Sequence, residues 1–121
     1  SHYDTTILEA VLARGDRKLS AVIYEAWKNG CKLDGWNEYF KPEIWNAAFE
    51  KFGIDKAFYA NRKREYDEIA PWEHMDMLFD RSFLVRENIK AHEEKTTANC
   101  REKCAGCGIN KCLGRACFKY E

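Results

Sequence analysis

The chain has 121 residues, of which 20 are basic and 20 acidic, so its net charge is zero. This balance argues against a broad, non-specific grip on nucleic acid or on an anionic membrane. No apolar run reaches the ~18 residues that cross a bilayer, and no signal segment is present, so we expect a cytoplasmic protein without membrane contact.

Apolar side chains recur at three- and four-residue spacing in the first third of the chain, which predicts helices with one buried face. We expect Asp4 to cap a first helix that Gly15 ends, and Asp16 to cap a second helix that Gly30 ends. An aromatic-rich connector follows at residues 31–41.

Proline and glycine also delimit the middle of the chain. Pro42 suits the first turn of a third helix, and Gly53 is its expected end. Asp55 opens a short fourth helix. The charge-dense stretch at residues 61–73 is predicted to be a loop, because Pro71 disfavours helix in the residue before it.

Asp80 is expected to cap the last long helix, which runs to His92, and residues 96–99 form a polar hinge. No strand alternation persists. The pattern therefore predicts an all-α fold, a small helical bundle with a C-terminal Cys-rich metal-binding loop. We expect a helical domain at residues 1–95, with a core that folds without metal, and a metal-binding tail at residues 96–121.

Five of the six cysteines are spaced C-x3-C-x2-C-x4-C-x4-C, at Cys100, Cys104, Cys107, Cys112 and Cys117. Thiolates are soft ligands, and four of them satisfy a tetrahedral zinc ion or one iron–sulfur cluster. The surrounding tail has few apolar residues, so we expect a metal to order it. We favour zinc, Zn²⁺, with a 4Fe-4S cluster as the alternative. The first three cysteines are the firmest ligands, and the fourth is Cys112 or Cys117.

The opening C-x3-C-x2-C spacing is that of the cluster loop of radical S-adenosylmethionine enzymes. Two features argue against that role here. Only fourteen residues follow Cys107, and Gly106 stands where that loop usually has an aromatic residue. We therefore expect a structural four-cysteine site and no catalytic residue in this chain.

Outside the tail, Cys31 is expected to be a buried thiol rather than a ligand. Arg14 and Arg17 flank a glycine stop and an aspartate cap, and the alternative is an arginine pair that grips a phosphate or a partner carboxylate. His74 lies between acidic residues, where a packed or hydrogen-bonded histidine is commoner than a proton relay or metal ligand.

Two loop features suggest partners. Arg62, Lys63 and Arg64 form a basic run beside tyrosines, so contact with RNA is an alternative function. Trp36 and Trp72 each stand in a predicted loop, where a ring is able to dock on a neighbouring domain.

A series of segments, in order and spread over nearly the whole chain, resembles one known family. They lie at residues 8–19, 26–36, 44–45, 58–62, 71–76, 83–87, 96–101 and 104–108. They resemble the stretch after the barrel in radical S-adenosylmethionine proteins that carry a cobalamin-binding-like domain at their N-terminus. The family is often described as Fe-S oxidoreductases, with no established reaction or substrate.

The resemblance implies a C-terminal accessory domain, monomeric as an isolated fragment, that packs on the barrel of the same polypeptide. S-adenosylmethionine and the radical-generating 4Fe-4S cluster would be bound by that barrel, and the fragment alone would not be an enzyme. An electron-transfer domain with an auxiliary cluster is a further alternative. The family pattern places a terminal cysteine in a glycine-containing segment, which Gly114 to Cys117 fits. The resemblance thus favours Cys100, Cys104, Cys107 and Cys117 as metal ligands, with Cys112 as a departure from the pattern.

Overall fold

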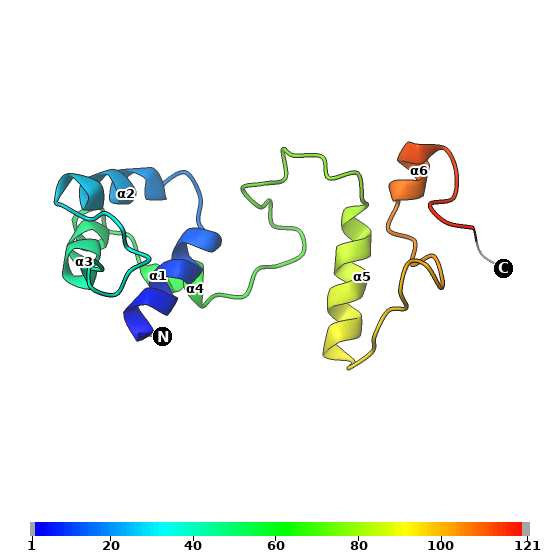
Figure 1. Ribbon diagram of the computed structural model, residues 1–121, viewed down its shortest axis with the longest axis horizontal. Coiled ribbons are helices and arrows are strands. Elements are labelled where there is room, and N and C mark those ends of the chain that lie inside the picture. Colours follow the sequence, from blue (N-terminus) through cyan, green and yellow to red (C-terminus); the bar gives the residue numbers. More distant parts are fainter. Residues whose placement is uncertain (1, 120–121) are drawn as a thin grey trace. The chain divides into compact units, whose positions relative to one another are not determined.

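The computed structural model describes residues 2–119, which form six helices and no strand (Figure 1). The prediction of an all-α fold is confirmed. The chain divides into two compact units, residues 1–71 and 72–121, called unit 1 and unit 2 below. None of the helices in the described residues has the length and apolar character that a bilayer crossing requires.

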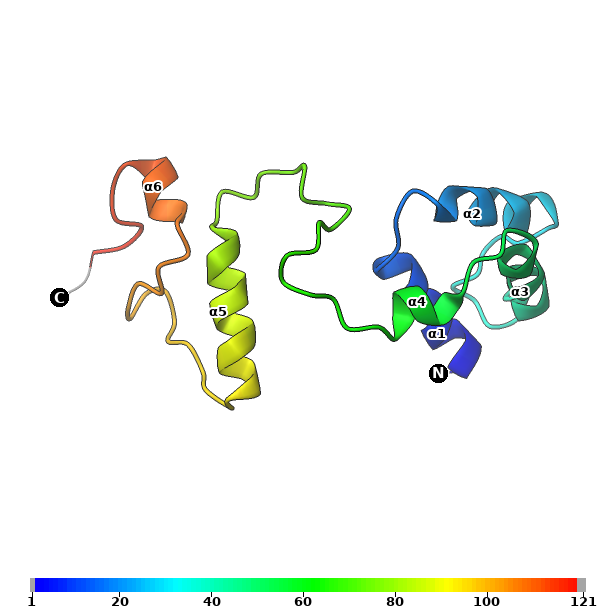
Figure 2. The ribbon, with the colours of Figure 1, turned by 180° about the vertical axis from the view of Figure 1, so that it is seen from behind.

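Unit 1 contains four helices, with α1 packed on α4 and α2 packed on α3 (Figure 2). Their bounds are Tyr3–Ala13 for α1, Leu19–Lys28 for α2, Pro42–Lys51 for α3 and Lys56–Ala60 for α4. Their apolar faces enclose one core, as the periodicity predicted. Its buried members are Leu8, Val11, Leu19, Val22, Ala26, Cys31, Trp45, Ala48, Phe49 and Tyr59.

Most helix ends in unit 1 lie where the sequence predicted them. Pro42 occupies the first turn of α3, and the Asp55 side chain caps α4 by accepting the N–H of Ala57 at 2.9 Å. Gly30 and Gly53 follow α2 and α3 with positive φ. After each helix, the N–H two residues beyond the cap bonds to the carbonyl five residues earlier at 3.0 Å, which satisfies an otherwise unpaired helix carbonyl.

Two predicted N-caps are wrong. α1 begins before Asp4, with His2 at the cap position, so Asp4 lies in the first turn, where its charge favours the helix dipole. α2 begins three residues after Asp16, because the Asp16 carboxylate accepts the N–H of Lys18 at 2.9 Å and forms a turn ahead of the helix. Gly15 follows α1 as predicted.

Unit 2 contains α5, Arg81–His92, and the short α6, Ile109–Leu113. Asp80 stands at the cap position of α5 as predicted, although its side chain makes no capping bond. After α5 the chain returns alongside the helix, and α6 lies near the end where α5 begins (Figures 1 and 2). The sequence did not predict α6.

Unit 2 has almost no interior. α5 buries none of its side chains, although apolar residues occur along it. Leu84 and Ile89 expose 50% and 45% of their surface. Within residues 72–119, Gly108 is the one buried residue. The expectation that the helices in general bury an apolar stripe is therefore wrong for α5, which belongs to the same compact unit as the cysteines.

Candidate metal centre

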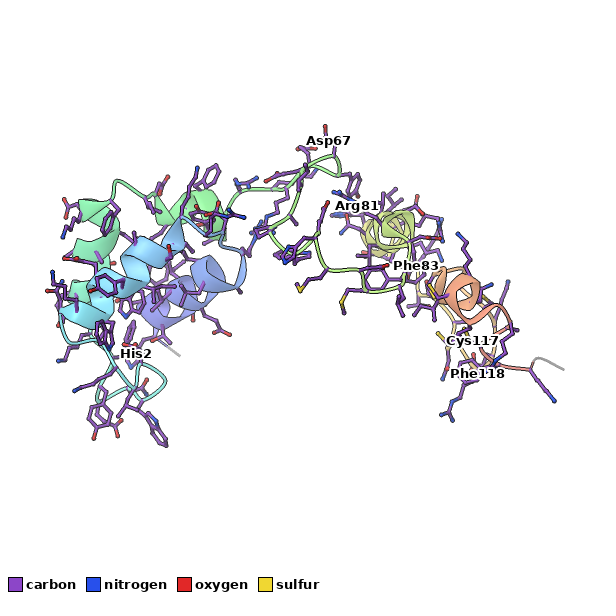
Figure 3. All side chains as sticks on the ribbon, turned by 90° about the horizontal axis from the view of Figure 1, so that it is seen from above. His2, Asp67, Arg81, Phe83, Cys117 and Phe118 are labelled. Atoms are coloured by element: carbon purple, nitrogen blue, oxygen red, sulfur yellow. The ribbon has the colours of Figure 1, made fainter. Side chains whose placement is uncertain are left out.

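The five tail cysteines all lie in unit 2, and within residues 2–119 none of them is joined in a disulfide. Cys107 and Cys117 are half-buried, whereas Cys100, Cys104 and Cys112 are exposed. Cys112 belongs to α6, and Cys117 lies beyond it, next to Phe118 (Figure 3).

The chemistry of this donor set fits a thiolate-bound zinc ion or iron–sulfur cluster. Across residues 2–119, however, no three histidine, cysteine, aspartate or glutamate side chains are grouped as a metal site. The ligand set of Cys100, Cys104, Cys107 and Cys117, with Cys112 as its competitor, stays a prediction.

One end of α5 holds the turn that contains Cys107. The backbone N–H of Asp80 donates to the carbonyl oxygen of Cys107 at 2.7 Å. The next residue, Gly108, has φ +99°, and a Cβ there would lie 2.7 Å from the Asp80 carboxylate. Lys111, on α6, donates from Nζ to Asp80 Oδ2 at 2.7 Å. Asp80 thus contacts the turn on both sides of Gly108.

Further polar bonds hold the returning chain along α5. Arg86 donates to the carbonyl oxygen of Gly106 at 3.0 Å. Thr97 donates its hydroxyl to Glu87 at 2.6 Å and accepts from Lys90 Nζ at 3.1 Å. The Thr97 hydroxyl is the main reason that the pKa of Glu87 is lowered. The segment that follows α5 and carries the cysteines is therefore attached to the helix by polar side chains rather than by a core.

These attachments are weak by themselves. The side chains of Lys111 and Asp80 are 70% and 43% exposed. Exposed ion pairs of this kind contribute about 0–1 kcal/mol each, since water and salt screen both charges. A unit of this size needs a further source of stability.

Cys31 lies in unit 1, apart from the other cysteines along the chain. It is 4% exposed and belongs to the core, and burial is the largest of the effects that raise the pKa of its thiol. A neutral, buried thiol is a poor nucleophile and a poor ligand. The prediction of a buried structural cysteine is confirmed.

The arginine between α1 and α2 has a structural role. Arg14 donates to the backbone carbonyl oxygens of Ala60 and Arg62 at 2.9 and 2.7 Å. Asp16 accepts from the Tyr59 hydroxyl at 2.9 Å. These bonds tie the α1–α2 turn to the end of α4, so both side chains have partners within unit 1.

Two of the three cations considered for RNA contact are engaged within unit 1. Arg62 forms a two-pronged ion pair with Glu68, and its guanidinium lies 4.4 Å from the Phe58 ring centroid. Arg64 donates to the backbone carbonyl of Arg14. Lys63 is exposed. Phosphate contact by this run would require Arg62 to leave a carboxylate and an aromatic face.

The remaining candidates lie at the surface. His74 is exposed, and Trp36 and Trp72 expose 62% and 46% of their area. The contacts of Asp80 were missed by sequence reasoning, which treated it only as a cap. Its long-range contacts are with Cys107, Gly108 and Lys111. The glycine directly after the cysteine was the one sequence signal of a close backbone approach.

The chain was compared with known protein families, curated proteins and solved structures. No protein family, curated protein or solved structure matches the chain, so the resemblance to radical S-adenosylmethionine proteins stays an expectation.

Proposed function

We propose that this chain is the C-terminal accessory domain of a radical S-adenosylmethionine Fe-S protein, and that unit 2 holds a zinc ion through four thiolates. The observation that carries the proposal is the coincidence of five thiols with the absence of a core. Residues 72–119 bury one glycine, and the same unit contains every cysteine except Cys31.

Magnitudes favour a metal as the missing source of stability. A unit of about 50 residues rarely gains more than about 3–5 kcal/mol from a core, and this one has none. A structural zinc ion contributes about 10–16 kcal/mol in small peptides at neutral pH. A site with that contribution would outweigh the few exposed ion pairs of unit 2.

Zinc is the favoured metal because it needs no redox role and is held by four thiolates in small turns. The turn from Cys104 to Gly108 supports such a site, since Gly106 and Gly108 both adopt positive φ and keep the backbone free of side-chain crowding. A 4Fe-4S cluster uses the same ligands and would make unit 2 an electron-transfer domain.

The partner in this proposal is the barrel of the parent protein. Exposed aromatic rings are suitable anchors, because they bury a large apolar area at low entropic cost. Trp36 and Trp72 offer such rings. The domain would pack on the barrel without catalysing a step itself.

Contact with RNA is less favoured, because Arg62 and Arg64 already have partners within unit 1. A gel shift with bulk RNA across a range of salt concentrations tests it. Phosphate binding by these cations must weaken as salt rises.

Metal analysis of the purified full chain tests the proposal directly. We expect one zinc ion per chain and a colourless protein, whereas a brown protein with broad visible absorption would identify the cluster instead. A metal-free protein whose five tail thiols all alkylate in the native state would contradict both forms of the site. A separate test uses the barrel of the parent protein, added in trans. We expect it to bind the chain and to protect Trp36 or Trp72 from solvent.

A further inference from the structure

We propose that Asp80 is a positioning residue that couples the thiolate site to α5. It holds the Cys107 turn on the first residues of the helix, so that metal bound by Cys107 orders α5. This inference rests on the proposed thiolate site, and its test separates the two.

The first argument is the backbone bond of Asp80. As the residue before α5, Asp80 has an N–H that the helix does not use, and this N–H donates to the carbonyl of Cys107 at 2.7 Å. The carbonyl of Asp80 accepts the N–H of Phe83 at 3.0 Å within the first turn of α5. One peptide segment therefore joins a candidate ligand to the helix.

The second argument is the close approach at Gly108. Its φ of +99° favours glycine, and a Cβ there would lie 2.7 Å from the Asp80 carboxylate, which would have to move to admit one. Gly108 is also the one buried residue within residues 72–119. The one buried residue among residues 72–119 thus lies where the cysteine turn meets Asp80.

The third argument is the contact with α6. Lys111 on α6 donates from Nζ to Asp80 Oδ2 at 2.7 Å. Cys112 also belongs to α6, and its thiol lies 4.0 Å from the carbonyl oxygen of Leu78. Residues 78–80 therefore contact both the Cys107 turn and a second thiol.

Coupling of this kind is reciprocal. If metal at Cys107 stabilises α5, formation of α5 raises metal affinity by the same factor. Outer groups that orient a ligand typically change affinity by about 10- to 100-fold when they are removed. Removal of the exposed Asp80–Lys111 pair should change metal affinity by the lower end of this range or less. Disruption of the contact at Gly108 should change it by an amount within the range.

A double-mutant cycle in the full chain tests the ion pair. Zinc affinity is measured by competition with a chromophoric chelator, and the Co²⁺ charge-transfer band reports the number of bound thiolates. We expect Asp80→Asn and Lys111→Met each to weaken zinc binding about two- to fivefold. The double variant should be no weaker than the weaker single variant, because both remove the same contact.

Gly108→Ala tests the close approach, with about a tenfold or larger loss of zinc affinity expected. The matched control is Lys95→Met, which removes an exposed ion pair with Glu93 just beyond the other end of α5. The control should bind zinc as the unchanged chain does. All variants should retain the thermal transition of unit 1.

Amide hydrogen exchange supplies a readout that does not depend on affinity. In the zinc-loaded chain the Asp80 amide should be protected, and Gly108→Ala should remove that protection while the Ile54 amide in unit 1 keeps its own. Absence of metal binding by the unchanged chain would overturn the proposed function. Zinc binding that Asp80→Asn and Gly108→Ala leave equal to the Lys95→Met control would overturn only the role of Asp80.

Discussion

Unit 1 and unit 2 are both built from helices, yet within residues 2–119 a core is found in unit 1 alone. The helices of unit 1 enclose ten buried residues, including Val11 and Val22 with no exposed surface. In unit 2, α5 is as long as any helix of unit 1 and buries nothing. Helical periodicity predicts a helix, but an interior also needs a second apolar face to pack against. In unit 2 that face is missing among the described residues, and we propose that thiolate ligation takes its place.

The largest expected effect is loss of a ligand. Cys107→Ser should abolish tight metal binding and melt unit 2, because the proposed site would supply the ~10–16 kcal/mol that a structural zinc contributes. Metal content after dialysis and hydrogen exchange over α5 measure both effects.

Two comparisons sharpen this prediction. Cys31→Ser should leave metal content unchanged, since Cys31 belongs to the core of unit 1. Of Cys112→Ser and Cys117→Ser, only one should release the metal, and that variant identifies the fourth ligand. Full metal retention by Cys107→Ser would contradict the proposal that unit 2, unlike unit 1, is stabilised by thiolate ligation.

The next effect separates the units by core packing. Phe49→Ala should destabilise unit 1 by about 3–5 kcal/mol, because Phe49 is 3% exposed and its removal leaves a cavity. Phe83→Ala removes a ring on α5 (Figure 3) that is only half-buried, so it should cost much less. Thermal or urea unfolding of the two variants checks the difference, and equal losses would show that unit 2 has a core after all.

Local signals made much of unit 1 predictable. Pro42, Gly30, Gly53 and Asp55 fix helix ends through their own backbone preferences, so the sequence alone located them. The early start of α1 was missed because an acidic residue suits the first turn as well as the cap.

Long-range contacts were not predictable in the same way. Arg14 bonds to carbonyls 46 and 48 residues away, and Lys111 pairs with a carboxylate 31 residues away. No local pattern encodes such pairs. The thiol spacing predicts the type of ligand but not which four thiols would bind a metal, because that depends on how the chain returns along α5.

Substitutions at two helix ends should have smaller effects on stability, of opposite sign. Gly53→Ala should destabilise unit 1 by about 1–2 kcal/mol, because φ +62° is unfavourable for a residue with a Cβ. α5 ends with the same bonds, but Glu94 occupies the left-handed position at φ 57°. Glu94→Gly should therefore stabilise α5 by about 1 kcal/mol. Unfolding monitored separately for each unit checks both signs.

The smallest effect concerns pH. The bonds from Arg62 are the main cause that lowers the pKa of Glu68 below its ordinary 4.5. A carboxylate with a lowered folded-state pKa stabilises the protein above its unfolded pKa, and this stability is lost as pH falls through the folded value.

Glu68→Gln should accordingly reduce the slope of stability against pH below about pH 4.5, and change little near neutrality. The thermal midpoint of unit 1 from about pH 6 to pH 3 measures it. A slope identical to that of the unchanged chain would show that the pair contributes nothing to acid sensitivity.

Chelation tests the contrast between the units most directly. Amide hydrogen exchange of the full chain is recorded before and after the metal is removed. We predict that α5, Arg81–His92, loses its protection, whereas α3, Pro42–Lys51, keeps it. Equal protection of α5 with and without metal would contradict the account, because unit 2 would then hold its structure without thiolate ligation.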